Sequence, residues 1–333
     1  VHYLTGYFPT NKGAYVVVVP DESPILVLGS EAESLIATAV SPEIEIAYPQ
    51  NSEQSQLDVV AELVRDRIAS QLVGVASGGQ AGLASGDLGK LANSLRDKEI
   101  RDSRAALMAA KRLKTTEDFK GLEDAVEIAE LGLKAFAGGV SPEMTERRAA
   151  AIIEGELIQL GVLTSLVFVS SGPFFGQRPS SRILSNGELI TVLVEIASLS
   201  GYWVEVGAIY SSDKTTSMAQ ELAECCIASL TETAEVITNE VECSVVADCM
   251  VEQLKCCGGI PMGGYGHGVG IDEESPVISQ FEDATITNGM ALALHPLLTN
   301  KDRTLSTTVA NTYVMKDGRS QSLSNYPHHV WAL

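Results

Sequence analysis

The most informative stretch of this chain reads Gly263-Gly264-Tyr265-Gly266-His267-Gly268-Val269-Gly270-Ile271-Asp272-Glu273-Glu274-Ser275-Pro276. Glycine on both sides of His267 removes steric bulk from around the imidazole and lets the backbone approach a ligand closely. A lone histidine is more often a satisfied core residue than a ligand, but this density of glycine favours a functional site. The acidic run 272–274 is expected to form a solvated turn before a strand, with Glu274 able to reach the rim of that site.

Length and charge limit the class of protein. The chain has 333 residues and a net charge of -20, from 23 basic and 43 acidic side chains. This length predicts two domains, and the acidic balance argues against nucleic acid or an anionic membrane as a partner, since both need a basic surface. The longest apolar runs are far shorter than the ~20 residues that span a bilayer. No leader opens the chain, and its start without methionine at Val1 predicts that residues upstream are missing. We expect a cytoplasmic enzyme or a protein derived from one.

The six cysteines gather in residues 225–257, as the doublets Cys225-Cys226 and Cys256-Cys257 plus Cys243 and Cys249. Adjacent cysteines rarely bridge each other, and these spacings match no zinc-binding pattern. A thiol metal or redox site is one reading. We favour the other, in which small apolar side chains are buried on helices in a reducing compartment.

The first domain is predicted to cover residues 1–110 and to be α/β. Strand-like runs at 14–19 and 25–28 flank a turn, and apolar residues at helical spacing fill 56–72. Residues 76–94 are rich in Gly, Ala and Ser and predict a loop or domain edge.

The second domain is predicted to cover residues 111–333 and to be α+β with an antiparallel core. A helix begins after the N-cap Thr115 and ends at Gly138-Gly139, and a second has Ser141 as its N-cap and Pro142 at its first position. Three strand-like runs, a pair of helices and a further set of strands follow. They lie at 165–169, 189–196 and 202–209, then 215–254, then 291–294 and 308–315.

The string Gly266-His267-Gly268-Val269-Gly270, followed by Glu274 and Pro276, resembles the pita-bread fold of methionine aminopeptidase, Xaa-Pro aminopeptidase, prolidase and creatinase. Other segments agree in order along the chain: Tyr3-Leu4-Thr5-Gly6, Lys114-Thr115-Thr116-Glu117, Arg178-Pro179-Ser180-Ser181-Arg182, Asn186-Gly187-Glu188-Leu189, Gly201-Tyr202, Asn288-Gly289-Met290 and His295-Pro296. The resemblance implies a pita-bread catalytic domain behind a smaller, creatinase-like N-terminal domain, and a homodimer.

The metal ligands of this family are mostly replaced. Metallopeptidases of the family hold two divalent ions with Asp, Asp, His, Glu and Glu, since carboxylates bridge hard cations. Glu205 matches the second Asp, and counting eleven residues back places Val194 at the first. Glu195 is one step away and so on the opposite face, unless the hairpin is one residue shorter. His295 replaces the first Glu, and Ala310 stands near the last. We therefore expect no dinuclear metal site and no cofactor.

Creatinase is the metal-free precedent in the family. A Glu similar to Glu205 and the His of the Gly-His motif, His267, are shared with it. Its general base is a histidine in the loop before the first site strand, and the corresponding loop 170–178 has no histidine. Creatinase activity itself is therefore not expected. The resemblance and the residues together predict that His267, His295 and Glu205 converge as an acid–base set.

The predicted function is metal-independent acid–base chemistry on a small amino-acid-derived, amide or amidine substrate, by C–N hydrolysis or by elimination or cyclisation. Glu205 would orient an imidazole or bind a substrate cation. The residues predicted to bind substrate are Arg178, Arg182, Phe174, Phe175, Trp203, Glu195 and Tyr265. Two alternatives stay open: a catalytically inactive binding module, and a metal-dependent Xaa-Pro aminopeptidase or prolidase. His328 and His329 are predicted to be exposed and without a function.

Overall fold

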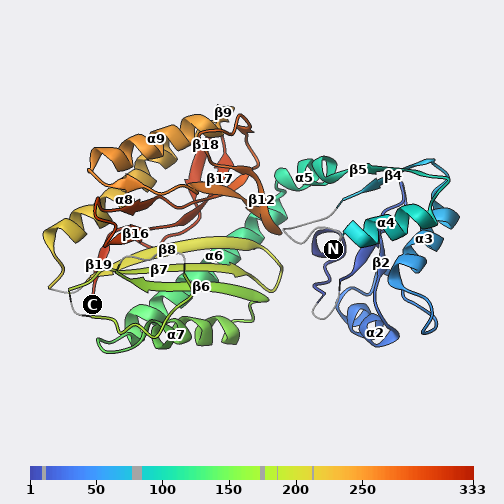
Figure 1. Ribbon diagram of the computed structural model, residues 1–333, viewed down its shortest axis with the longest axis horizontal. Coiled ribbons are helices and arrows are strands. Elements are labelled where there is room, and N and C mark those ends of the chain that lie inside the picture. The colour runs from blue at the N-terminus through green and yellow to red at the C-terminus, as the bar shows by residue number, and fades with distance from the viewer. Residues whose placement is uncertain (10–12, 77–84, 173–176, 186, 212–213) are drawn as a thin grey trace. The chain divides into compact units, whose positions relative to one another are not determined.

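The computed structural model describes residues 1–9, 13–76, 85–172, 177–185, 187–211 and 214–333. The chain divides into two compact units, Val1–Ala110 and Lys111–Leu333 (Figure 1). No helix in the described part of the chain is long and apolar enough to cross a membrane.

The first unit is a small α/β domain. Strands β1 (Tyr15–Val17), β2 (Ile25–Val27) and β3 (Glu45–Ala47) form one sheet, in which β1 and β2 are antiparallel and β2 and β3 parallel. Strands β4 (Leu72–Val75) and β5 (Glu99–Asp102) form a parallel pair. The helices are α1 (His2–Thr5), α2 (Glu31–Val40), α3 (Gln56–Arg67), α4 (Ser85–Ser94) and α5 (Arg104–Arg112). The loop predicted for 76–94 is wrong in its second half, where α4 forms and packs Leu91 into the core.

The second unit has two pairs of helices. Its first helix, α6 (Thr116–Gly139), begins with a capping box between Thr115 and Asp118 and ends where the sequence predicts. The helix α7 (Glu146–Gln159) begins after the N-cap Thr145, so the predicted start at Ser141 is wrong. Glu143 has a φ of 77°, a left-handed conformation that no α-helix can contain, and this delays the helix by a turn. The second pair is α8 (Ser217–Val236) and α9 (Cys243–Cys256).

Two larger sheets lie between these helix pairs. One has the order β19-β8-β7-β6, in which only β19 and β8 are parallel, and the other has the antiparallel order β12-β11-β14-β17-β18. Their strands are β6 (Thr164–Ser171), β7 (Ile190–Ala197), β8 (Trp203–Ser211), β11 (Gly266–Gly270), β12 (Asp272–Val277), β14 (Ala291–Leu294), β17 (Asn311–Lys316), β18 (Arg319–Ser322) and β19 (Val330–Ala332). Smaller sheets join β10 (Ile260–Pro261), β15 (Leu297–Thr299) and β16 (Ser306–Thr308), and pair β9 (Val241–Glu242) with β13 (Thr285–Ile286).

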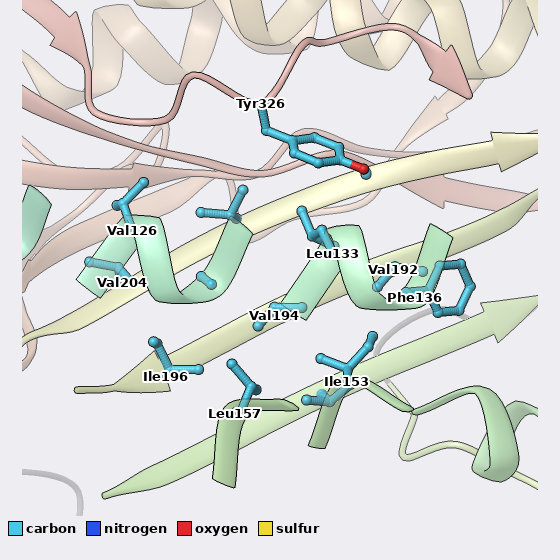
Figure 2. Close-up of a cluster of buried hydrophobic side chains, with 14 of the residues drawn as sticks. Val126, Leu133, Phe136, Ile153, Leu157, Val192, Val194, Ile196, Val204 and Tyr326 are labelled. Carbon is cyan, nitrogen blue, oxygen red and sulfur yellow. The ribbon is translucent and has the colours of Figure 1, made fainter. Parts of the chain in front are cut away.

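Each helix pair covers the outer face of one sheet. Alternate residues of β7 and β8 pack against α6 and α7, including Val194 and Ile196 against Leu133 and Ile153 (Figure 2). On the other side, α8 and α9 pack against β14 and β17. The sheets therefore have their inner faces toward each other, which is the curved sheet between helix pairs that the resemblance implies.

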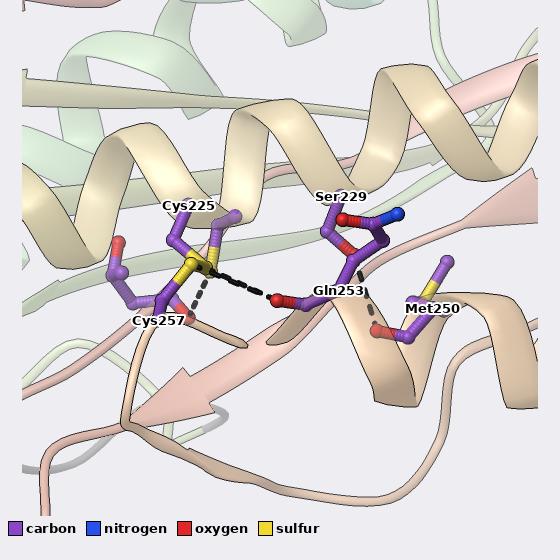
Figure 3. The surroundings of a disulfide bond; sticks show 7 residues. Cys225, Ser229, Met250, Gln253 and Cys257 are labelled. Carbon is purple, nitrogen blue, oxygen red and sulfur yellow. Dashed lines mark hydrogen bonds between the residues drawn. A yellow bond between two sulfur atoms is a disulfide. The ribbon is translucent and has the colours of Figure 1, made fainter. Parts of the chain in front are cut away.

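A disulfide links one cysteine of each doublet, Cys225 of α8 and Cys257 after α9 (Figure 3). The prediction that all six cysteines are reduced is therefore wrong for two of them. Adjacent cysteines do not bridge each other, as expected, but the antiparallel packing of α8 and α9 brings the two doublets together. Since disulfides persist mainly in oxidising compartments, the pair gives no support to the reducing compartment that the sequence suggested. Cys226 and Cys243 are buried thiols, as predicted.

Candidate active site

Glu205 lies at the junction of the two large sheets. Its side chain points inward from β8 and is buried. The hydroxyl of Thr312, on β17, accepts a hydrogen bond from the Glu205 main-chain N–H at 3.0 Å and donates one to its C=O at 2.9 Å. Two residues further along β8, the N–H of Gly207 donates to the carbonyl of Ala310. A Cβ on residue 207 would lie 2.7 Å from the main-chain nitrogen of Ala310. Glycine at 207 therefore lets the two strands approach closely and fixes the position of Glu205.

His267 is placed by the glycines on either side of it, but not in the way the sequence suggests. A Cβ at Gly266 would lie 2.3 Å from the carbonyl oxygen of Ala293, and one at Gly268 would lie 2.7 Å from that of Ser275. These glycines make room for the neighbouring strands β14 and β12 rather than for a ligand. The tight packing holds His267 in one position between two strands.

The third group, His295, follows directly after β14, and its main-chain N–H donates to the carbonyl of Tyr265. Its Nε2 lies 3.9 Å from one oxygen of Glu205, while Nε2 of His267 lies 2.8 Å from the other. The two imidazole rings are 5.5 Å apart between centroids. The structure thus brings the three predicted catalytic side chains together, with one carboxylate between two imidazoles.

The protonation of His267 follows from its two hydrogen bonds. Its Nδ1 lies 3.0 Å from the carbonyl oxygen of Gly268, which can only accept, and its Nε2 faces the Glu205 carboxylate. A neutral imidazole has one N–H and satisfies only one of these acceptors, whereas an imidazolium satisfies both. Protonation of His267 would thus make the pair an imidazolium–carboxylate ion pair.

Burial acts on the two remaining groups in different ways. Burial favours the uncharged acid of Glu205, but the hydrogen bond from His267 and the charge of both imidazoles outweigh it, so its pKa lies below the ordinary value. Burial lowers the pKa of His295, and the Glu205 carboxylate opposes this shift only in part. His295 is consequently neutral near pH 7 and able to accept a proton.

The pairing of β7 with β8 corrects the predicted register. Glu195 lies directly opposite Glu205, and Val194 lies opposite Val206 in the buried core layer. The hairpin is one residue shorter than the family spacing assumes, with a turn in which Gly201 has a φ of 86°. Glu195 therefore occupies the position of the first Asp and shares the inner face with Glu205, which is the alternative of a shorter hairpin rather than the spacing of eleven residues.

The donor set does not fit two metal ions. Among the described residues, the group whose ligand atoms lie within 4.8 Å of one another contains Glu205, His267 and His295, and it does not include Glu195. Ala310 supplies no ligand at the position of the last Glu. One carboxylate cannot bridge and neutralise two divalent ions.

A single ion is a closer fit to these three side chains. One oxygen of Glu205 is buried without a hydrogen-bond partner. Two ligand atoms at about 2.0–2.1 Å from a tetrahedral zinc ion lie about 3.3 Å apart, whereas the Glu205 and His267 atoms are 2.8 Å apart. The pair as it stands is hydrogen bonded, and an ion between its atoms would need them to separate by about 0.5 Å.

The residues predicted to bind substrate differ in their burial and in their contacts. Arg178 is exposed, whereas Arg182 pairs with Glu188 and donates to the hydroxyl of Ser171. Phe174 and Phe175 lie outside the described residues. Trp203 and Tyr265 pack against the two main core clusters, Trp203 partly buried and Tyr265 buried.

Two predictions outside the catalytic set are wrong. Glu274 is not in a solvated turn: its side chain is 3% exposed and lies 2.5 Å from Nζ of Lys114 and 3.6 Å from Nζ of Lys111, both also buried. Gly270 makes room for it, because a Cβ there would lie 2.3 Å from a Glu274 oxygen. His328 is partly buried and hydrogen bonds to Asn311, whereas His329 is exposed as predicted.

Thr312, which holds the main chain of Glu205, is not among the residues predicted from the sequence. A threonine inside a strand carries no signal of such a role, and only the meeting of β8 with β17 reveals it.

Comparison with known proteins gives a consistent result. Residues 120–317 match the model of metallopeptidase family M24. The chain is 24% identical over 317 residues to the Xaa-Pro dipeptidase of Pyrococcus furiosus, covering 89% of this chain and 82% of that protein. Its structure is similar to an Xaa-Pro dipeptidase from Bacillus anthracis (TM-score 0.87, 15% identity, 100% of this chain and 92% of the other). It is also similar to an X-Pro aminopeptidase from Thermotoga maritima (TM-score 0.86, 14% identity, 100% and 93%). These structures share the whole two-domain fold.

Proposed function

This chain belongs to metallopeptidase family M24, and we propose that it is a metal-independent hydrolase of a C–N bond in a small amino-acid-derived substrate, an amide or an amidine. One observation carries the proposal: the buried carboxylate of Glu205 lies between two imidazoles, hydrogen bonded to His267 and 3.9 Å from His295. The two imidazoles can serve as a general acid and a general base without a metal ion.

The two imidazoles have different roles in the proposed reaction. His295, neutral because burial lowers its pKa, takes a proton from the attacking water as general base. The protonated His267 donates a proton to the leaving nitrogen, for which its hydrogen bond to Glu205 or to Gly268 must open. Water adds to the carbon as the C–N bond breaks, and the proton taken by His295 returns to His267 through solvent. The same two transfers would serve an elimination or a cyclisation.

Glu205 positions His267 rather than binding a substrate cation. Its side chain is 3% exposed, and both of its oxygens face imidazoles. Of the two candidate arginines, Arg182 is occupied by Glu188, so Arg178 is the residue we propose for a substrate carboxylate. Arg178→Gln should raise KM for substrates that carry a carboxylate and leave kcat nearly unchanged.

Access to the imidazoles favours an enzyme over an inactive binding module. The side chains of His267 and His295 are 13% and 21% exposed, although Glu205 between them is almost fully buried. A relic site filled by neighbouring side chains would not keep both of its titratable groups in reach of solvent.

The test is turnover of a panel of dipeptides, including Xaa-Pro sequences, and of small amides and amidines. His267→Ala and His295→Ala should each lower kcat at least about tenfold, or about 1.4 kcal/mol of barrier, while His329→Ala serves as the exposed control. If a substrate is found and neither variant slows it, the acid–base assignment is wrong.

Metal dependence is measured on the same protein. We expect well below one equivalent of Mn, Co, Fe or Zn in protein purified without chelator, and activity that survives dialysis against a chelator. The Glu205 oxygen that lacks a hydrogen-bond partner favours one competing hypothesis, in which a single zinc ion is bound by Glu205, His267 and His295. One equivalent of zinc whose removal abolishes turnover would establish that hypothesis and refute metal independence.

The homodimer implied by the family is part of the proposal. Light scattering should give twice the 35.3 kDa of one chain, and a monomer would contradict it.

A further inference from the structure

A cavity of about 640 Å³ lies outside the candidate active site, between the C-terminal half of α8 and strands β17 and β18. Asn311 lines it from β17, and Thr312, the next residue, hydrogen bonds to Glu205 on the other face of that strand. Successive residues of a strand point to opposite faces. The cavity and the catalytic set are therefore separate sites that share one strand.

A buried polar group lines this cavity with an unused acceptor. Asn311 is fully buried, and its amide nitrogen donates to the hydroxyl of Ser322 at 2.8 Å and to Nε2 of His328 at 3.0 Å. These two bonds fix the orientation of the amide. Its oxygen has no hydrogen-bond partner, and a buried acceptor left unsatisfied costs about 1–3 kcal/mol. Because the oxygen itself is buried, it marks a polar wall of the cavity rather than an exposed acceptor.

Two opposite charges line the same cavity. Glu235, near the end of α8, and Arg319, at the start of β18, are both exposed. Neither has an ion-pair partner among the residues that the structure describes. The strand β18 lies directly on the end of the helix, since the hydroxyl of Ser320 donates to the Ala234 carbonyl at 2.5 Å.

The end of α8 adds to the charge of Glu235. The last carbonyls of a helix carry a partial negative charge that favours a cation. The cavity thus offers an anionic position at the helix end and a cationic one on the adjacent strand, with room for more than the two charged groups.

We propose that this cavity binds the zwitterion of an α-amino acid. The Arg319 guanidinium binds the carboxylate through paired hydrogen bonds, and Glu235 with the end of α8 binds the ammonium group. This binding does not depend on the reaction proposed at His267.

The experiment is isothermal titration of the full chain with glycine, L-alanine, L-leucine and L-proline in turn. At least one should bind with a Kd of about 1 mM or tighter. Its N-acetyl derivative, which lacks the ammonium group, and its amide, which lacks the carboxylate, should each bind at least about tenfold more weakly.

Variants locate the binding. Arg319→Gln and Glu235→Gln should each weaken it at least about fivefold, while Glu232→Gln, an exposed carboxylate one turn away on α8 that does not line the cavity, should leave it unchanged. His267→Ala should also leave it unchanged, which separates this site from the catalytic one. Three results would overturn the proposal: no binding of any of the four amino acids, binding that disappears in His267→Ala, or wild-type affinity in both cavity variants.

Discussion

Removing the disulfide by Cys257→Ser should destabilise the second unit by several kcal/mol. The bridge joins residues 32 apart in the sequence, and closing a loop of about 32 residues in the unfolded chain removes entropy worth about 3.7 kcal/mol at 25 °C. Because Cys257 is exposed, its replacement opens no cavity, and the measured loss should come from the cross-link. We expect about 2–4 kcal/mol, since native disulfides often deliver less than the entropy predicts.

The assay is equilibrium unfolding in urea, followed by tryptophan fluorescence. Both tryptophans, Trp203 and Trp331, belong to the second unit, so the signal reports the part of the chain that contains the bridge. Cys256→Ser is the matched control, because it removes the exposed, unbridged thiol next to Cys257. A dithiol reductant should lower the midpoint of wild type and of Cys256→Ser but not that of Cys257→Ser.

Two outcomes would refute this reasoning. If Cys257→Ser and Cys256→Ser unfold at the same urea concentration, the bridge contributes nothing to stability. If reductant leaves the wild type unchanged while mass spectrometry shows two new thiols, the bridge forms but the loop-entropy argument fails.

Three further predictions concern the packing around the two sites. Gly268→Ala should lower the free energy of unfolding by at least about 2 kcal/mol, measured by heat or urea, since its Cβ would lie 2.7 Å from a backbone atom. Gly263→Ala, whose Cβ would have no atom within 4 Å, should be nearly neutral. Equal melting temperatures of the two variants would contradict this prediction. Thr312→Val should lower kcat more than Thr312→Ser does, because only serine keeps a hydroxyl for the main chain of Glu205, and equal kcat values would remove its positioning role. Burial lowers the pKa of His328 below 6.5, so its contribution to stability is present above that pH and is lost as the pH falls. Wild type should therefore lose more stability between pH 8 and 5 than His328→Gln, and parallel pH curves would show that this histidine is not responsible.

The fold could be predicted from the sequence for two reasons. Some residues determine the structure of their near neighbours, and others match the family's motifs in the same order along the chain. Thr115 and Asp118 define a helix start within four residues, and the glycines around His267 mark a strand packed closely on both sides. The clustering of Glu205, His267 and His295 could be predicted for a different reason: the family motif brings these residues to one place, and no periodicity in the chain does so.

The register of Glu195 could not be predicted by counting. The family spacing of eleven residues assumes one hairpin length, and a turn shorter by one residue keeps the inner face but moves the partner of Glu205 from Val194 to Glu195. The turn itself, with Gly201 in a left-handed conformation, is what changes the length. Counting residues relies on an assumed hairpin length and does not show how many residues the turn contains.

Long-range partners account for the remaining errors. An acidic run such as 272–274 looks solvated because nothing near it in sequence is basic, yet Lys114, 160 residues away, reaches Glu274. Cys225 and Cys257 were likewise judged by their neighbours in sequence, whereas α8 and α9 bring together one member of each doublet. In both cases the tertiary contact decides the chemical state of the group.

The same principle explains why the loss of carboxylates at the centre need not mean decay. In the metallopeptidases that this chain resembles, clustered carboxylates are stable in the interior because two cations neutralise them. Here the three-residue cluster contains Glu205 as its carboxylate, and a protonated His267 beside it would balance that charge. Restoring a second carboxylate at position 295 would leave a net negative charge that only a cation could offset. Histidine at 295 instead adds no charge near pH 7, because burial lowers the pKa of its ring, and this fits the metal-independent reaction that we propose.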